Sequence, residues 1–279
     1  MTRRGWWLFL ALSVIWGFPY LFIRVAVREL TPASLVFLRT TIGALLLLPL
    51  VLKNGRLRAL LPRWRWILLF TFVEVAIPWW LLSDAERRIT SSLSGLLIAS
   101  VPILGALLSR WTGAHQPLGP RRLAGLVLGF AGVIALVGMD LRGDVAAILE
   151  MTLVVLGYAL GPLIISQRLS DLPSLDVIAA SLMACAILYA PFGIAQLPPA
   201  MPSPAALIAV VVLGVLCTAI AVLAGVALLA EPFTLGTAVG FILILAGSWL
   251  ATASPPATPV ARAALEDAGG VAKLTQRTG

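Results

Sequence analysis

The chain has 279 residues, of which 60% are apolar and only 11% are charged, and its mean hydropathy is +1.02. Soluble domains carry roughly 25% charged residues, so this composition excludes a soluble globular protein and indicates an integral membrane protein. The net charge of +8 lies mostly in short connections between apolar runs, where basic residues report membrane topology rather than nucleic-acid binding.

The residue types that usually carry out catalysis or bind metals are few and scattered. Cys185 and Cys217 both lie in apolar runs, where a thiol behaves as a small hydrophobic side chain. His115 stands in a connection, without cysteine or carboxylate partners at the spacing of metal ligands. The sequence contains no Ser-His-Asp set, phosphate-binding loop or dinucleotide-binding motif. We therefore expect no catalytic residue, no metal and no cofactor.

Apolar runs of about twenty residues recur along the chain, and each can cross a hydrocarbon core of about 30 Å. The first follows Arg3 and Arg4 but has no small-residue cleavage site, so we expect a retained helix. The run 205–230 suits one tilted span and not two. Nine spanning helices are predicted, at residues 6–26, 33–52, 64–82, 89–111, 123–139, 145–166, 175–196, 205–230 and 234–253. Residues 254–279 are predicted to form a disordered tail.

Basic residues in the short connections predict which side of the membrane each connection faces. With a cytoplasmic N-terminus, eleven of them fall on the cytoplasmic side, namely Arg3, Arg4, Lys53, Arg56, Arg58, Arg63, Arg65, Arg110, Arg121, Arg122 and Arg168. Four fall on the other side, namely Arg28, Arg87, Arg88 and Arg142. This excess predicts a multi-pass protein of the inner (plasma) membrane with its N-terminus in the cytoplasm.

A repeat relates the two halves of the chain. A proline followed by two glycines recurs at an offset of 115 residues, as Pro117, Gly125 and Gly132 and then Pro232, Gly240 and Gly247. Glycines at this spacing let a neighbouring helix approach closely. Two units of five helices would enter the membrane from opposite sides and form an inverted repeat. The second unit is short of about one helix, so we divide the chain into a first repeat at 1–139 and a shortened repeat at 140–253.

Charged and aromatic residues inside the predicted helices are candidates for a substrate path, because a charge in a span should face a cavity or a partner. Glu74 is the first candidate and Arg39 is the internal cation; a protonated Glu74, or a salt bridge between them, would be a structural alternative. Glu150 is close to a helix start, where the helix dipole also favours a carboxylate. The aromatic candidates, which could instead form an interfacial belt, are Trp16, Trp79, Trp80 and Tyr158. The candidate helix bends are Pro19, Pro102 and Pro162.

Short motifs along residues 6–253 match one known family. They are Trp16-Gly17, Pro19, Arg39, Ser91 to Ser94, Pro102, Pro117, Gly125, Ala131-Gly132, Glu231-Pro232, Gly240 and Ala246-Gly247. In these motifs the chain resembles the EamA-type drug/metabolite transporter superfamily, whose members have two inverted five-helix repeats. It departs from the family at 205–230, where one run replaces two helices that belong to the central cavity of the family.

The resemblance implies an all-α secondary transporter that works by alternating access. It would move small metabolites, amino-acid-like or drug-like solutes, as an exporter, and would not be an enzyme. The expected partners are the lipid bilayer, a small-molecule substrate and a coupling proton on Glu74 or Glu150, with a homodimer left open and no nucleic acid. Two alternatives remain: a shortened, non-transporting membrane protein without a complete cavity, and a membrane-embedded enzyme, which the lack of a catalytic cluster disfavours.

Overall fold

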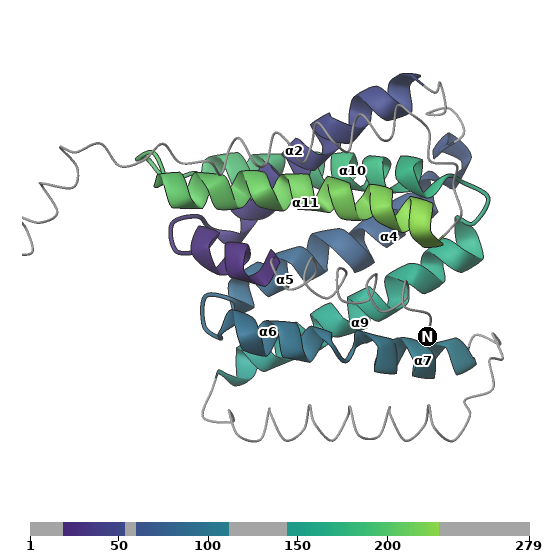
Figure 1. The fold of residues 1–279 in the computed structure, drawn as a ribbon, viewed down its shortest axis with the longest axis horizontal. Helices are drawn as coiled ribbons and strands as arrows, with labels where there is room; N and C mark the ends of the chain where they lie inside the picture. Colours follow the sequence, from purple (N-terminus) through teal and green to yellow (C-terminus); the bar gives the residue numbers. More distant parts are fainter. Residues whose placement is uncertain (1–18, 54–59, 112–143, 229–279) are drawn as a thin grey trace, which may run out of the picture.

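The computed structural model describes residues 19–53, 60–111 and 144–228, and the regular structure in these ranges is all helical (Figure 1). Four helical stretches among them are long and apolar enough to cross a membrane, namely Pro32–Pro49, Leu61–Ala85, Val145–Arg168 and Ser174–Ala195. The chain is therefore a multi-pass helical membrane protein.

A helical segment at residues 19–26 precedes the labelled elements. These are α2 (Pro32–Lys53), the 3-10 turn η1 (Leu61–Arg63), α4 (Trp64–Phe70), the π-helix η2 (Thr71–Ala76), α5 (Ile77–Ala85), α6 (Ser91–Ile98), α7 (Val101–Trp111), α9 (Val145–Arg168), α10 (Ser174–Ala195) and α11 (Pro204–Leu228).

Four of these helices begin and end within two residues of the predicted spans: α2, α9, α10 and α11. Prolines account for three of the starts, because Pro32 and Pro204 open their helices and Pro173 directly precedes α10. The Asp144 carboxylate accounts for the fourth, since it accepts a hydrogen bond of 2.9 Å from the backbone N–H of Ala146 and caps α9. The nine-helix count and the inverted repeat extend beyond the described residues and stay predictions.

The span predicted at 64–82 is one long stretch of helix, but it is not uniformly α-helical. It runs through η1, α4, η2 and α5 as one candidate span. In η2 the backbone N–H of Ile77 bonds to the carbonyl oxygen of Phe72, five residues earlier. The next residue is Pro78, which has no N–H to continue the pattern. The wide turn thus lies where the hydrogen-bond ladder of the helix is interrupted.

The span predicted at 89–111 is divided into two helices. Ala99 and Ser100 separate α6 from α7, and Pro102 is the second residue of α7. The candidate bend at Pro102 therefore coincides with a break in the helix, because proline suits a first turn and not a helix interior. Pro162, in contrast, lies inside α9, which continues through it as one helix.

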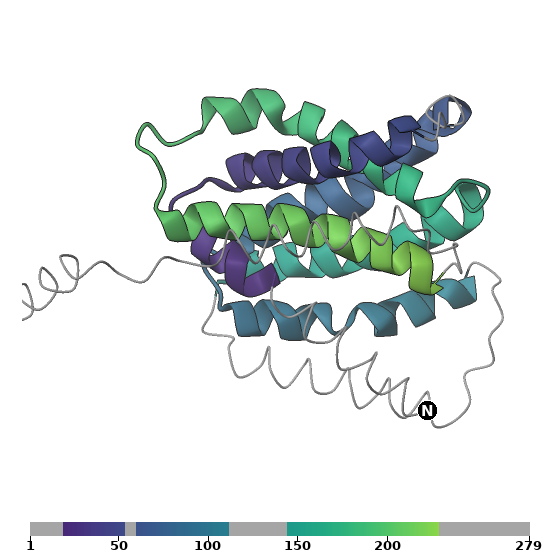
Figure 2. The same ribbon diagram turned by 45° about the horizontal axis from the view of Figure 1, so that its top comes forward.

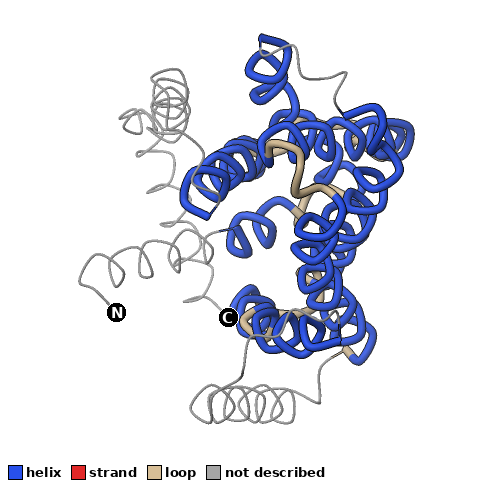
Figure 3. Tube along the Cα trace, turned by 90° about the vertical axis from the view of Figure 1, so that its right-hand side faces the viewer, coloured by secondary structure: helices blue, strands red, loops and turns tan. Residues whose placement is uncertain are grey.

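The helices pack into two neighbouring groups. In one group, α2 packs against both α10 and α11, and Figure 2 shows it between them. In the other, α9 packs against α5 and η2 on one side and against α6 and α7 on another. The view turned by 90° about the vertical axis shows these helices stacked one above another, with short connections between them (Figure 3). Two apolar clusters are buried, and each includes residues from helices of both groups.

The connections between helices gather at the two ends of this bundle, and at each end polar contacts join connections that are distant in sequence. At one end, Glu29 accepts hydrogen bonds from the hydroxyl and backbone N–H of Ser203, at 2.5 and 2.6 Å. These bonds join the turn before α2 to the start of α11. At the opposite end, Arg63 and Asp171 form an ion pair of 3.0 Å between η1 and the turn before α10. We call these the Glu29 end and the Arg63 end.

Candidate functional site

The centre of α2 carries a buried arginine. Arg39 is 4% exposed, and its Cζ lies 3.5 Å from the ring centroid of Trp79 on α5. This distance is that of a cation–π contact, which is strong when the pair is desolvated. Among the residues that the structure describes, the buried Nε and Nη1 atoms of Arg39 find no hydrogen-bond partner. The structure therefore brings two sequence-predicted residues together, with donor groups of the guanidinium left over.

Glu74 lies in the π-helix η2 and points to α9 rather than to Arg39. Its Oε2 atom is buried and has no hydrogen-bond partner within 19–53, 60–111 and 144–228. A Cβ added at Gly161 of α9 would stand 1.9 Å from this oxygen, so only a glycine leaves room for the carboxyl group there. Among the described residues no ion pair joins Glu74 to Arg39. Arg39 thus contacts Trp79 of α5, whereas Glu74 contacts Gly161 of α9.

A second glycine of α9 lies one turn before Gly161 and fits the same part of the neighbouring helix. A Cβ at Gly157 would stand 2.4 Å from the carbonyl oxygen of Val73 and 2.7 Å from Cγ of Pro78. The close approach thus involves backbone on one side and the ring of the helix-interrupting proline on the other. Small residues of this kind allow membrane helices to pack backbone against backbone.

The remaining candidates are distributed over the molecule. Tyr158 packs against the apolar cluster that includes residues of 19–26, α5 and α11, whereas Trp80 is 40% exposed on the outside of α5. Pro19 is the first residue that the structure describes. Trp16, Gly125, Gly132, Gly240 and Gly247 lie outside the described residues.

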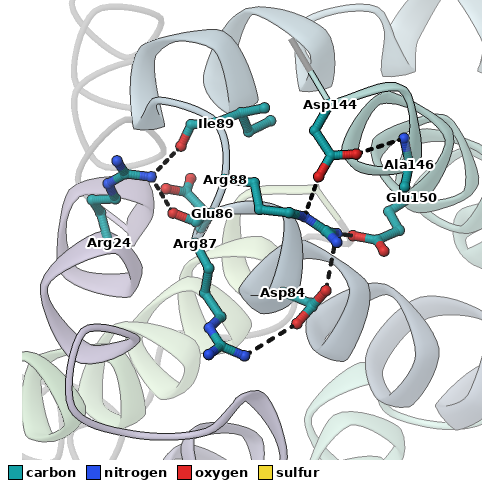
Figure 4. Close-up of polar contacts among 9 residues, drawn as sticks. All are labelled: Arg24, Asp84, Glu86, Arg87, Arg88, Ile89, Asp144, Ala146 and Glu150. Atoms are coloured by element: carbon teal, nitrogen blue, oxygen red, sulfur yellow. Dashed lines mark hydrogen bonds and ion pairs between the residues drawn. The ribbon is translucent and has the colours of Figure 1, made fainter.

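Glu150 belongs to a charged network at the Glu29 end (Figure 4). Arg88, in the turn after α5, pairs with Asp84 at 2.9 Å, with Asp144 at 3.2 Å and also with Glu150. Its hydrogen bond to Glu150 is the main cause that raises the pKa of the Arg88 guanidinium, while partial burial acts in the opposite direction. Arg88 thereby joins the turn after α5 to the first turns of α9.

Glu86 was missed by sequence reasoning, although the structure buries it completely. It is 0% exposed and lies in the same turn as the well-solvated Arg87. Arg24, from the segment 19–26, donates hydrogen bonds to the backbone carbonyls of Glu86 and Ile89 (Figure 4). Burial raises the pKa of Glu86 to about 7, and the nearby Ser94 hydroxyl and Arg24 charge partly oppose this rise. In the sequence, nothing distinguishes Glu86 from the other charges of residues 84–88.

A phenol connects the surroundings of Glu86 with those of Arg39. Tyr20 is 8% exposed and its ring lies against Gly95 of α6. Both the Glu86 carboxyl and the Arg39 guanidinium act electrostatically on its hydroxyl. Buried polar groups therefore extend from the centre of α2 to the turn after α5, through a bundle whose other buried residues are largely apolar.

These features define the class of protein: it is a helical multi-pass membrane protein with charged groups inside the bundle. Residues 3–138 match the model of the EamA-like transporter family. The resemblance predicted from the motifs is thereby confirmed, over a segment that nearly coincides with the first repeat predicted at 1–139.

Two further similarities accompany the family match. An "Uncharacterized transporter" of Archaeoglobus fulgidus is 30% identical over 132 residues, which cover 47% of this chain and 45% of the relative. The match thus spans less than half of the relative's length. A solved structure titled "Crystal structure of protein" superposes with a TM-score of 0.50 and 21% identity, covering 87% of this chain and 97% of its own. At this identity the likeness concerns the fold alone.

Proposed function

We propose that this protein is a secondary transporter that exports small metabolites, amino-acid-like or drug-like solutes by alternating access. The observation that carries the proposal is the match of residues 3–138 to the EamA-like transporter family. The buried polar groups support it, because charges inside a membrane bundle are costly unless they serve a polar path or find partners. A transporter also needs no catalytic cluster, so we do not assign the protein an enzymatic activity.

In this proposal Arg39, Trp79 and Glu74 contribute to the substrate path. Arg39 offers free donor groups beside the flat face of Trp79, which suits a solute that has an acceptor group next to an apolar or aromatic body. Glu74 offers a carboxyl oxygen without a partner in the neighbouring helix. We keep Trp16, Trp80, Tyr158 and Glu150 as further path candidates on the sequence argument alone.

We also propose that two inverted repeats form the bundle. The repeat would make α2 equivalent to α10 and the helix at 64–85 equivalent to α11. Supporting this, α2 packs directly on α10, and the contact of α2 with α11 has its counterpart in the contacts of α10 with α4 and η2. We further propose that the Arg63 end faces the cytoplasm, with the N-terminus on the same side; the excess of basic residues in the connections at that end supports this orientation.

Transport is tested with the purified full-length chain in sealed lipid vesicles. Efflux of each of the common amino acids and of the cationic dye ethidium is measured for the wild type, Glu74→Gln and Glu29→Gln. We expect transport of at least one probe and its loss in Glu74→Gln, while Glu29→Gln, a change at the solvated end, transports normally. Normal rates in a correctly folded Glu74→Gln protein would make Glu74 a structural residue only.

A second candidate is a shortened membrane protein that does not transport. The observation in its favour is α11, which fills the stretch from Pro204 to Leu228 as a single helix where the resemblance leads us to expect parts of two. The vesicle assay separates the candidates, because the shortened protein would move no probe. A cytoplasm-specific fluorescent reporter fused after Gly279 tests the topology: nine spans place it outside, and a bright fusion would contradict them.

A further inference from the structure

The turn between α5 and α6 holds a carboxyl group in an unusual setting. Glu86 directly follows the last residue of the membrane-spanning stretch Leu61–Ala85, yet it is 0% exposed. Both of its carboxyl oxygens are buried. A carboxylate in such a place is costly unless it is paired or carries a proton. The question is therefore which neighbouring charge, if any, is available to pair with it.

The charged groups around Glu86 are engaged elsewhere. On its own turn, Arg88 is held by Asp84 together with Asp144 and Glu150 from α9, and Arg87 faces Asp84. No ion pair to Glu86 is formed by any described residue.

The neighbouring helices supply three groups that face Glu86. The segment 19–26 contributes Tyr20 and Arg24, and α6 contributes the Ser94 hydroxyl. Arg24 uses Nη1 for the backbone carbonyls of Glu86 and Ile89 and not for the carboxyl group (Figure 4). The guanidinium group of Arg39 on α2 acts electrostatically on the Tyr20 hydroxyl and stacks on the ring of Trp79. The carboxyl group thus has polar groups nearby, but none of these groups forms an ion pair with it.

We propose that Glu86 is a proton-binding site, and that it takes up and releases the proton that this carrier exchanges with the solvent at the Glu29 end. The coupling to transport rests on the proposed function, whereas proton binding does not. The step is a simple transfer: an O–H bond of a hydronium ion breaks, an O–H bond of the neutral carboxylic acid forms, and a water molecule is left. The pKa of about 7 that burial gives this carboxyl group suits exchange under physiological conditions.

Protonation would alter the contact between the segment 19–26 and the turn after α5. With a neutral Glu86, the two carbonyls are the best acceptors near Arg24, as in the structure. With an ionised Glu86, the carboxylate attracts Arg24 more strongly than a carbonyl does. The charge of one side chain can therefore change how Arg24 holds the turn, and this is a structural link between proton binding and helix position.

Proton binding is tested by infrared difference spectroscopy of the purified full-length chain between about pH 5 and about pH 9. The C=O stretch of protonated carboxyl groups is followed, so the single histidine, His115, does not contribute. We expect one carboxyl group to titrate near pH 7 in the wild type and in the surface control Glu29→Gln, and this titration to be absent in Glu86→Gln. A titration that persists in Glu86→Gln, or no titration in the wild type, would overturn the proposal.

A conservative variant covers the case in which Glu86→Gln fails to fold. Glu86→Asp keeps the carboxyl group but shortens the side chain by one methylene, so its titration should persist at a shifted pH. An unchanged midpoint in Glu86→Asp would contradict the assignment, because moving the titrating group should alter its surroundings.

Coupling is tested separately with vesicles that contain ethidium or an amino acid together with a pH-sensitive dye. We expect efflux by the wild type to change by about threefold or more between pH 6 and pH 8, and efflux by Glu86→Gln to vary far less. Equal pH dependence in both proteins would refute the coupling while leaving the spectroscopic result intact. If no probe moves while the carboxyl titration is present, the proposed function fails and the proton site stands.

Discussion

The contact between α9 and the helix of residues 64–85 has two regions that are held together differently. In the middle, Gly157 and Gly161 of α9 receive Val73 and Glu74 so closely that no side chain would fit. At the Glu29 end, the same two helices are joined by Arg88, which bridges Asp84 and Glu150. Steric fit holds the part within the apolar bundle, and charge holds the part that water reaches. A single helix pair can therefore be stabilised by close packing where it is buried and by ion pairs where it is solvated.

The largest effect is expected at Gly157. In Gly157→Ala the new methyl group meets the carbonyl oxygen of Val73 at 2.4 Å, and a backbone atom cannot rotate away. Overpacking of this kind should lower stability by about 3 kcal/mol. Thermal unfolding in detergent micelles measures it, with Gly105→Ala as the matched control, because no atom of the described part of the chain lies within 4 Å of a Cβ at Gly105. Equal melting temperatures for the two variants would show that the middle region is loosely packed.

The pH dependence at Glu86 is expected to come next. Its folded-state pKa of about 7 lies above the ordinary value of 4.5, so the folded chain binds more protons than the unfolded chain between these two pH values. The stabilising contribution is therefore complete below pH 4.5 and is lost as the pH rises through about 7; the part lost between pH 5 and pH 8 is roughly 2 to 3 kcal/mol. Melting curves at pH 5 and pH 8 should show this loss in the wild type but not in Glu86→Gln. A parallel decline in both proteins would assign it to another group.

A smaller effect is expected at Gly161, where a side chain rather than backbone stands opposite. The Gly161→Ala methyl group meets the end of the Glu74 side chain, which can move in part. We expect a loss of about 1 to 2 kcal/mol. Glu74→Ala should recover much of this loss, since it removes the carboxyl group that the methyl group displaces. A double-mutant cycle measures the coupling, and strict additivity of the two changes would mean that the residues do not touch.

The smallest effect is expected at Arg88. Its side chain is 32% exposed, and solvent screens its ion pairs, so Arg88→Gln should cost about 1 kcal/mol and less at high salt. Arg87→Gln is the control, because Arg87 is 52% exposed and its one ion pair with a described residue is that to Asp84, at 3.6 Å. Melting temperatures of the two variants at low and high ionic strength test this. A larger loss in Arg87→Gln than in Arg88→Gln would contradict the bridging role of Arg88.

Much of the fold could be predicted because apolar runs and prolines mark where helices begin and end. Arg39 and Glu74 could likewise be selected, since charges inside spans are rare. Their neighbours could not be predicted: Arg39 stacks on Trp79 and Glu74 fits a glycine, which depends on how helices distant in sequence pack. Glu86 escaped notice for the same reason, because it is buried by the segment 19–26 and by α6 rather than by its own neighbours in the chain.

The π-helix η2 also affects how the length of this chain can vary during evolution. A π turn accommodates about one residue more than an α-helical path over the same distance. Deleting a single residue other than Glu74 between Thr71 and Ala76 would therefore allow an ordinary α-helix whose two halves keep their relative orientation. The same deletion in the middle of α9 would rotate one half of that helix against the other by about 100°. Loss of one residue should therefore be tolerated better in η2 than in α9, although a hydropathy profile would not distinguish the two helices.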